Sequence, residues 1–150
     1  MFAISVRLAG LADLAVLAPL FDAYRQFYQQ PADLPAAQAY LQARLQQQQA
    51  VVLLAQDGHH RHIGFCLMYP GFCSVIAAPV LLLSDLFVTP EARRTGAGRA
   101  LLQAAEQHAR SAGFARMDLT TAKTNLRAQT LYRSLGWCKD EVFDAYNKLL

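Results

Sequence analysis

The sequence predicts an α/β fold in which helices pack on a mixed β-sheet. Apolar runs of strand length, such as residues 50–55 and 81–88, alternate along the chain with segments whose apolar residues recur at three- and four-residue steps. Turn residues separate these elements, and a basic, glycine-containing loop joins one buried strand directly to a helix. The predicted order is strand, helix, helix, strand, strand, strand, helix, strand, helix, strand.

The composition is typical of a single globular domain spanning residues 1–150. Hydrophobic residues make up 54% of the chain and charged residues 17%, which argues against disorder. No apolar run has the length of a membrane-spanning helix and no secretion signal is recognisable, so we expect no membrane association. The three cysteines are widely spaced without a zinc-binding pattern, so we expect reduced thiols in a cytoplasmic protein.

The N-terminal part is predicted to form one strand and two helices. Residues 1–8 alternate between apolar and polar side chains, as in a strand. Asp13 is a candidate cap for a helix that ends before Pro31, and Asp33 with Pro35 can start a second helix. The apolar face of the first helix comprises Leu14, Leu17, Phe21, Tyr24 and Tyr28.

The middle of the chain is predicted to be a hairpin followed by a further strand. The Asp57-Gly58 pair should turn the chain between strands at residues 50–55 and 62–69. Pro70-Gly71 is expected to break or turn the second of these strands. The next strand covers residues 81–88.

The C-terminal part is predicted to contain two helices and two strands. A helix over residues 97–112 is followed by a strand over residues 114–121. Asn125 can cap a second helix, which Gly136 ends. Residues 138–150 complete the chain as a final strand.

The loop before the third helix indicates a polyphosphate ligand. Its free backbone N–H groups, the positive end of the helix dipole and several arginines all suit anionic oxygens. The positive charge gathers at this loop, which favours a small anionic ligand over a nucleic-acid surface. A Rossmann motif is excluded because Leu101 stands where the third glycine belongs, and a P-loop is excluded because no Gly-Lys-Ser/Thr follows.

Three motifs coincide with this order of elements. Arg93-x-x-Gly96-x-Gly98 lies between strand and helix, Asn125 precedes Ala128-Gln129-x-Leu131-Tyr132, and Leu135-Gly136-Trp137 follows. Together they resemble the GNAT superfamily of N-acetyltransferases, and the resemblance extends over essentially the whole chain. It implies a mixed, mostly antiparallel sheet of six to seven strands flanked by about four helices.

The resemblance also implies acetyl-CoA as donor and an amine as acceptor. From the residues themselves we expect no metal. The implied acetyl-CoA-binding residues lie on a strand end, on the glycine loop and on the last helix: Leu86, Phe87, Val88, Arg93, Arg94, Thr95, Gly96, Ala97, Gly98, Arg99, Asn125 and Tyr132. The N–H of Val88 is the candidate donor to the developing oxyanion.

Tyr132 is the candidate general acid for the departing thiolate, because a phenol titrates near about 10 and a thiol near about 8.5. Packing alone is the alternative role for Tyr132, as helix capping is for Asn125. Asp85 is the candidate base, and it could equally position a cationic acceptor or bond irregular backbone. Tyr24, Phe27, Tyr28, Asp85 and Tyr146 are the candidate acceptor-binding residues, although aromatic residues at helical spacing are more often core.

The predicted function is acetyl-CoA-dependent acetylation of a primary amine on a small molecule, either a polyamine or an amino-acid-like compound. Two alternatives stay open: a CoA-binding sensor without catalysis, and an enzyme acting on protein lysines or N-termini. The final strand could pair with a neighbouring copy, so a homodimer is also predicted. The histidines at residues 59, 60 and 62 are interpreted as a surface cluster rather than as a metal site.

Overall fold

A computed structural model of the chain describes residues 3–150 and divides into two compact units, Met1–Leu119 and Thr120–Leu150. The strand predicted at residues 1–8 corresponds to β1 (Ser5–Ala9), and residues 1–2 lie outside the described part. The prediction of one domain over residues 1–150 stays a prediction. No helix of the described residues is long and apolar enough to cross a membrane.

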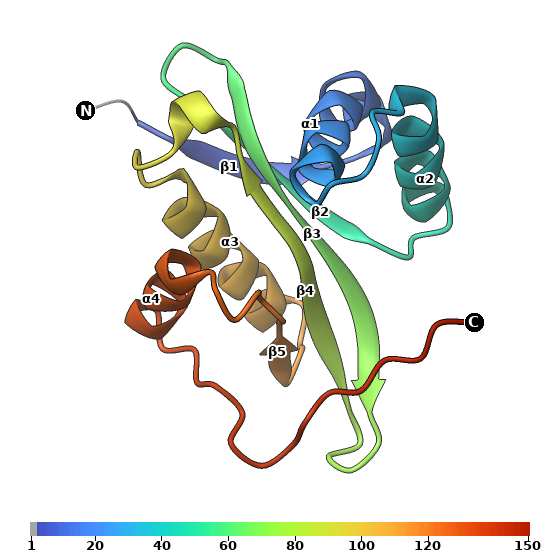
Figure 1. Cartoon of the computed structure of the whole chain (residues 1–150), viewed down its shortest axis with the longest axis vertical. Helices are drawn as coiled ribbons and strands as arrows, with labels where there is room; N and C mark the ends of the chain where they lie inside the picture. Colours follow the sequence, from blue (N-terminus) through green and yellow to red (C-terminus); the bar gives the residue numbers. More distant parts are fainter. Residues whose placement is uncertain (1–2) are drawn as a thin grey trace. The chain divides into compact units, whose positions relative to one another are not determined.

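The first unit is a five-stranded sheet with helices on both faces (Figure 1). The strands run in the order β1-β2-β3-β4-β5, and only the β4–β5 pair is parallel. The mixed, mostly antiparallel sheet is thus confirmed, with five strands in place of six or seven. After β1 the elements of this unit are α1 (Leu14–Phe27), α2 (Leu34–Gln46), β2 (Val51–Gln56), β3 (His62–Cys73), β4 (Ala78–Val88), α3 (Ala97–Ser111) and β5 (Arg116–Asp118).

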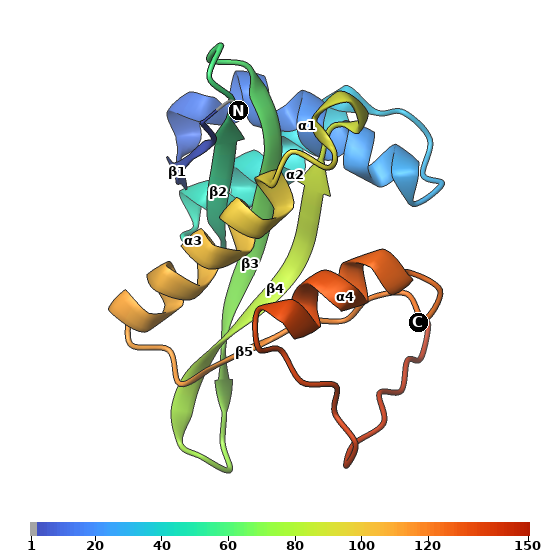
Figure 2. The same ribbon diagram turned by 90° about the vertical axis from the view of Figure 1, so that its left-hand side faces the viewer.

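Helices α1 and α2 cover one face of the sheet, and α3 covers the other (Figure 2). Because both faces of β2 are covered, its side chains are apolar on both sides. Val52, Leu53, Leu54 and Ala55 are all buried. The core under α1 and α2 includes Leu17, Phe21, Leu41, Phe65 and Phe87.

Local signals identified most helix ends correctly. The Asp33 carboxylate accepts a hydrogen bond from the Ala36 N–H at 3.0 Å and caps α2. Gly113 follows α3 in the left-handed region at φ +82°, as its predicted role as a helix stop requires. Asp13 precedes α1 but does not cap it through its side chain, because its carboxylate binds Arg7 and the Gly10 N–H.

The predicted break at Pro70-Gly71 is wrong, because β3 runs through both residues to Cys73. Strand β2 pairs with β3 only as far as Met68. Beyond that residue one side of β3 is an edge, and an edge tolerates proline because no ladder hydrogen bond is lost there.

The predicted final strand over residues 138–150 is also wrong. This segment of the second unit forms no strand and all of its residues are exposed. The Asp140 carboxylate accepts hydrogen bonds from the N–H groups of Val142 and Phe143 at 2.8 and 3.0 Å. Such a local turn uses N–H groups that a ladder would need. The strand predicted at residues 114–121 is shortened to β5.

The second unit contains α4 (Leu126–Ser134). The Asn125 side chain accepts a hydrogen bond from the Ala128 N–H at 3.2 Å and caps this helix. Gly136 ends it at φ +88°. Both predicted ends of this helix are confirmed.

Strand β4 contains a bulge at Ser84. Leu67 pairs with Asp85 and Met68 pairs with Leu83, so Ser84 has no partner position on β3. A bulge changes the direction of the side chains next to it, so that neighbours in sequence can face the same side.

Nearer its C-terminal end, β4 passes very close to β3 at Gly64. A Cβ on Gly64 would lie 2.5 Å from the Phe87 carbonyl oxygen and 3.3 Å from the Val88 Cα.

We expect Gly64→Ala to destabilise the fold by about 1–3 kcal/mol, because the added methyl would overlap backbone that cannot move independently. Gly10→Ala is the matched control, since Gly10 has extended backbone and open space where the added methyl would lie. The control should change the free energy of unfolding by less than about 0.5 kcal/mol. Urea unfolding measures both variants, and equal midpoints would contradict the close approach at Gly64.

Candidate functional site

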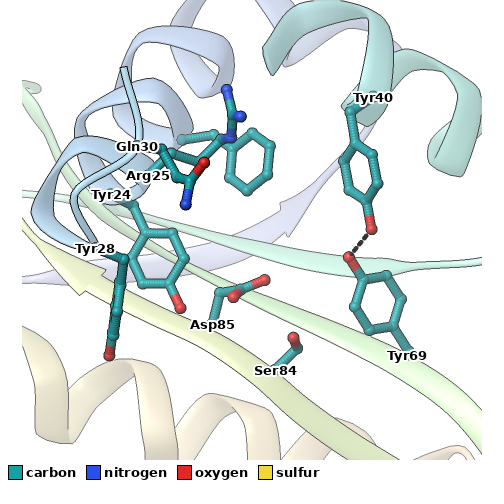
Figure 3. A pocket seen from close by; sticks show the side chains of 9 residues that line it. Tyr24, Arg25, Tyr28, Gln30, Tyr40, Tyr69, Ser84 and Asp85 are labelled. Atoms are coloured by element: carbon teal, nitrogen blue, oxygen red, sulfur yellow. Dashed lines mark hydrogen bonds between the residues drawn. The ribbon is translucent and has the colours of Figure 1, made fainter. Parts of the chain in front are cut away.

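A cavity of about 330 Å³ opens between α1, α2 and strands β3 and β4 (Figure 3). Its volume is in the range of small-molecule binding pockets. Aromatic side chains dominate its lining, with one carboxylate and one guanidinium among them. The lining residues are Phe21, Tyr24, Arg25, Tyr28, Gln30, Tyr40, Tyr69, Ser84 and Asp85.

The bulge in β4 is what places Ser84 and Asp85 in the same cavity. Consecutive side chains of a regular strand point to opposite faces of the sheet. Both residues line the cavity because Ser84 is the extra residue of the bulge. Asp85 is half-buried while Ser84 is exposed, so the carboxylate lies deeper than the hydroxyl.

Burial raises the pKa of Asp85 above its ordinary value, against the opposing effect of the Tyr24 and Ser84 hydroxyls. The Tyr24 hydroxyl points toward the Asp85 carboxylate (Figure 3). Burial, and then the interaction with Asp85, raises the pKa of Tyr24 above that of a free phenol. Tyr24 is therefore a neutral hydroxyl that can donate to an ionised Asp85.

A second polar feature of the cavity is a pair of tyrosine hydroxyls. Tyr40 on α2 and Tyr69 on β3 share a hydrogen bond of 2.5 Å (Figure 3). Burial and then the bond to Tyr40 raise the pKa of Tyr69. The Tyr40 ring also stacks on Phe21, with ring centroids 5.6 Å apart, and this contact further fixes the position of Tyr40.

The structure brings together three of the five acceptor-binding residues predicted from the sequence: Tyr24, Tyr28 and Asp85. Phe27 is not part of the lining and is 59% exposed, and Tyr146 lies in the second unit and is 92% exposed. Six further lining residues were not predicted as site residues from the sequence: Phe21, Arg25, Gln30, Tyr40, Tyr69 and Ser84. They belong to no motif and come together from several elements, among them α1, α2, β3 and β4, so no local signal could have identified them.

The basic loop between β4 and α3 has the backbone that an anion site needs. Gly96 precedes α3 with φ +92°, a conformation that favours glycine, and no atom lies within 4 Å of the place a Cβ would take. Its backbone is therefore open to approach. Gly96 has no side chain that could cap the helix. The first N–H groups of α3 have no acceptor within the helix. The Thr95 hydroxyl donates to the Ala92 carbonyl at 2.6 Å and holds the loop closed.

Arg93 connects this loop to the end of β4. Its Nε donates to the Val88 carbonyl at 3.2 Å, and its guanidinium lies 5.6 Å from the Phe27 ring centroid and 6.0 Å from that of Phe87. These contacts give Arg93 a positioning role. They also explain why Phe27 lies beside the loop rather than in the cavity.

The C-terminal end of β4 offers a free strand edge. Strand β5 pairs only with Val80, Leu81 and Leu82, so in the described residues β4 has no neighbour on that side at Leu86–Val88. The Thr89 N–H donates to the Ile63 carbonyl of β3 at 2.8 Å. Because backbone groups alternate along a strand, the N–H of Val88 points away from β3, toward the free edge.

Asn125 and Tyr132 both belong to the second unit. Asn125 caps α4, which is the structural role considered for it above. Tyr132 is half-buried on α4, with its ring centroid 6.2 Å from that of Trp137. Its hydroxyl is therefore carried by a packed ring rather than by a mobile one.

The histidine cluster at the β2–β3 turn is organised by Asp57. The Asp57 carboxylate accepts hydrogen bonds from the N–H groups of His59 and Arg61, and it forms an ion pair with the Arg61 guanidinium. Across residues 3–150 no group of three or more histidine, cysteine or acidic side chains is placed to hold a metal ion. Asp57 thus acts as a turn residue.

The sequence profile of the Acetyltransferase (GNAT) family matches residues 17–137. YhfO of Bacillus subtilis, named an uncharacterized N-acetyltransferase, is 42% identical over 142 residues, which is 95% of each chain. A crystal structure of a probable acetyltransferase is 36% identical, with a TM-score of 0.92 over 97% of both chains.

A ribosomal-protein-alanine N-acetyltransferase from Brucella melitensis biovar Abortus superposes with a TM-score of 0.83 at 22% identity, over 99% of this chain and 100% of its own, and shows the likeness of fold alone. The family profile and the identity to YhfO cover most of the sequence, including the glycine loop and the Asn125–Trp137 segment. The chain belongs to the GNAT family of acetyltransferases, whose members in general use acetyl-CoA.

Proposed function

We propose that this protein transfers the acetyl group of acetyl-CoA to the primary amine of a small molecule held in the cavity beside β4. The observation that carries this proposal is the position of Asp85. It is a half-buried carboxylate in a cavity of aromatic side chains, on the strand whose next residues, Leu86–Val88, have a free edge.

The glycine loop and the strand edge are the proposed binding site for acetyl-CoA. The backbone of the loop from Arg93 to Arg99 would bind the pyrophosphate, with Arg94 and Arg99 adding positive charge. The outward N–H and carbonyl groups of β4 would pair with the pantetheine arm as an added strand does. Asn125 and Tyr132 are the remaining members of the proposed donor site.

The proposed reaction starts with the acceptor as an ammonium ion, because a primary amine titrates near about 10.4. Asp85 takes the proton, directly or through water, and the freed nitrogen attacks the thioester carbonyl carbon. The Val88 N–H donates to the oxygen as negative charge develops on it. The carbon–sulfur bond then breaks, and Tyr132 gives its proton to the departing thiolate. The attacking nitrogen loses its second proton to water, from which the Tyr132 phenolate takes a proton back.

The small-molecule acceptor is supported by the cavity itself. A peptide acceptor calls for an extended groove, and the lining here is a compact set of aromatic side chains with a single carboxylate. The sensor hypothesis is less well supported, because binding of CoA alone requires neither Asp85 nor the aromatic cavity.

Release of free CoA from acetyl-CoA with a panel of amines tests the proposal. No release with any small amine, together with acetylation of peptides, would overturn it.

Asp85→Asn should lower kcat/KM by about 10²- to 10⁴-fold, which is the range of general-base catalysis. Because the pKa of Asp85 is raised, its carboxylate forms at a higher pH than that of an ordinary aspartate. Activity of the unaltered enzyme should therefore fall as the pH drops through that raised pKa, and the Asn variant should lose this acid limb. Asp118→Asn, which alters an exposed ion pair with Arg116, is the matched control. An unchanged acid limb in Asp85→Asn would give Asp85 a positioning role only.

Tyr132→Phe should lower kcat while leaving KM for the acceptor and the melting temperature unchanged. The substitution removes the proton donor but keeps the ring that packs near Trp137. Steady-state kinetics and a thermal melt measure these quantities. A kcat equal to that of the unaltered enzyme would remove Tyr132 from the mechanism.

We further propose a homodimer, supported by the apolar side chains Val142, Phe143, Tyr146 and Leu149, which are 77–97% exposed in the C-terminal segment. Light scattering that finds only monomers would reject it.

A cytoplasmic location is supported by the three cysteines, which are all unbridged.

A further inference from the structure

The wall of the cavity contributed by α1 carries a cation without a counter-ion. Arg25 lines the cavity, and its Nη1 is buried without a hydrogen-bond partner. No carboxylate of residues 3–150 forms an ion pair with it. A buried donor of a charged group is costly to leave unpaired, so Arg25 is a candidate to bind an anion that enters the cavity.

The nearest acid along α1 is already engaged elsewhere. Asp22 precedes Arg25 by three residues and is 8% exposed. One of its oxygens accepts from the Gln26 side chain at 3.1 Å, and the other accepts from the Asp33 N–H at 2.9 Å. Asp22 therefore joins α1 to the start of α2 and leaves the Arg25 guanidinium without a protein anion.

A second arginine, Arg44, lies near the cavity without lining it. The Arg44 guanidinium lies 5.1 Å from the ring centroid of Tyr40, which lines the cavity, and the Arg44 Nε is also buried without a partner. Asp85, the single carboxylate of the lining, comes from β4, away from the Arg25 guanidinium on α1 (Figure 3). The cavity thus has a negative wall and a positive wall.

We propose that the acceptor carries a carboxylate or similar anionic group in addition to its amine, and that Arg25 binds that group. This inference rests on the proposed function, since it assigns the second end of the same acceptor. The amine lies toward Asp85 and the free edge of β4, and the anionic end lies toward α1. A planar carboxylate suits the fork of guanidinium N–H donors. A polyamine does not fit, because its second ammonium would meet Arg25 with no carboxylate to neutralise it.

Three compounds with the same chain length and the same amine test the proposal: δ-aminovalerate, n-pentylamine and cadaverine. They differ only at the far end, which is anionic, neutral or cationic. We expect kcat/KM to fall in that order, with about a tenfold or larger difference between the first and the last. The reason is that a substrate which leaves polar groups of the site unpaired has a lower kcat/KM. Equal values, or cadaverine as the best acceptor, would overturn the proposal.

Arg25→Met should remove the advantage of δ-aminovalerate over n-pentylamine, through a higher KM for δ-aminovalerate. Arg25→Lys should keep part of that advantage, because lysine keeps the positive charge but lacks the two parallel N–H donors of a guanidinium. The melting temperature of Arg25→Met should be unchanged or higher, since the substitution removes an unpaired buried donor. Arg110→Met is the matched control, because the Arg110 side chain is 78% exposed on α3, and it should leave the order of acceptors intact. An equal loss with all three compounds in Arg25→Met would show a structural role only.

Thermal shifts measured without acetyl-CoA separate this inference from the proposed function. If none of the amines is acetylated, the proposed function fails. Stabilisation of the protein by δ-aminovalerate but not by cadaverine, lost in Arg25→Met, would still support the anion subsite. Absence of that difference would reject it.

Discussion

The bulge at Ser84 is the feature on which the rest of the proposed site depends. It shifts the register between β3 and β4, and it lets Ser84 and Asp85 face the same cavity. Just before the bulge β5 stops pairing with β4, so the following residues up to Val88 keep an open edge. The bulge therefore divides β4 into a part that pairs within the sheet and an end that is available to the proposed substrates.

The same strand connects the two halves of the proposed chemistry. Its side chain at Asp85 faces the cavity, its backbone at Val88 faces the free edge, and Arg93 links it to the glycine loop. The close approach of Gly64 fixes where this strand end lies. The buried core beneath the cavity gives Asp85 its raised pKa, so the packing that stabilises the sheet also tunes the candidate base.

Much of the fold could be predicted because it is encoded locally. Helix caps such as Asp33 and Asn125, and stops such as Gly113 and Gly136, act within one turn of the backbone. The failed predictions at Pro70-Gly71 and at residues 138–150 both depend on strand partners. Pro70 is tolerated because β2 has already ended, and residues 138–150 form no strand although their sequence allows one.

The sequence by itself determined the proposed donor side of this protein. The arginine- and glycine-containing loop is contiguous, and its chemistry follows from backbone conformations that neighbouring residues dictate. Only the tertiary structure decided the acceptor side. Arg25, Tyr40, Tyr69 and Asp85 come from α1, α2, β3 and β4, and they line one cavity through the packing of the helices on the sheet. Asp85 was predicted from the sequence, but Arg25, Tyr40 and Tyr69 were not, because each of them taken alone looks like an ordinary member of its helix or strand.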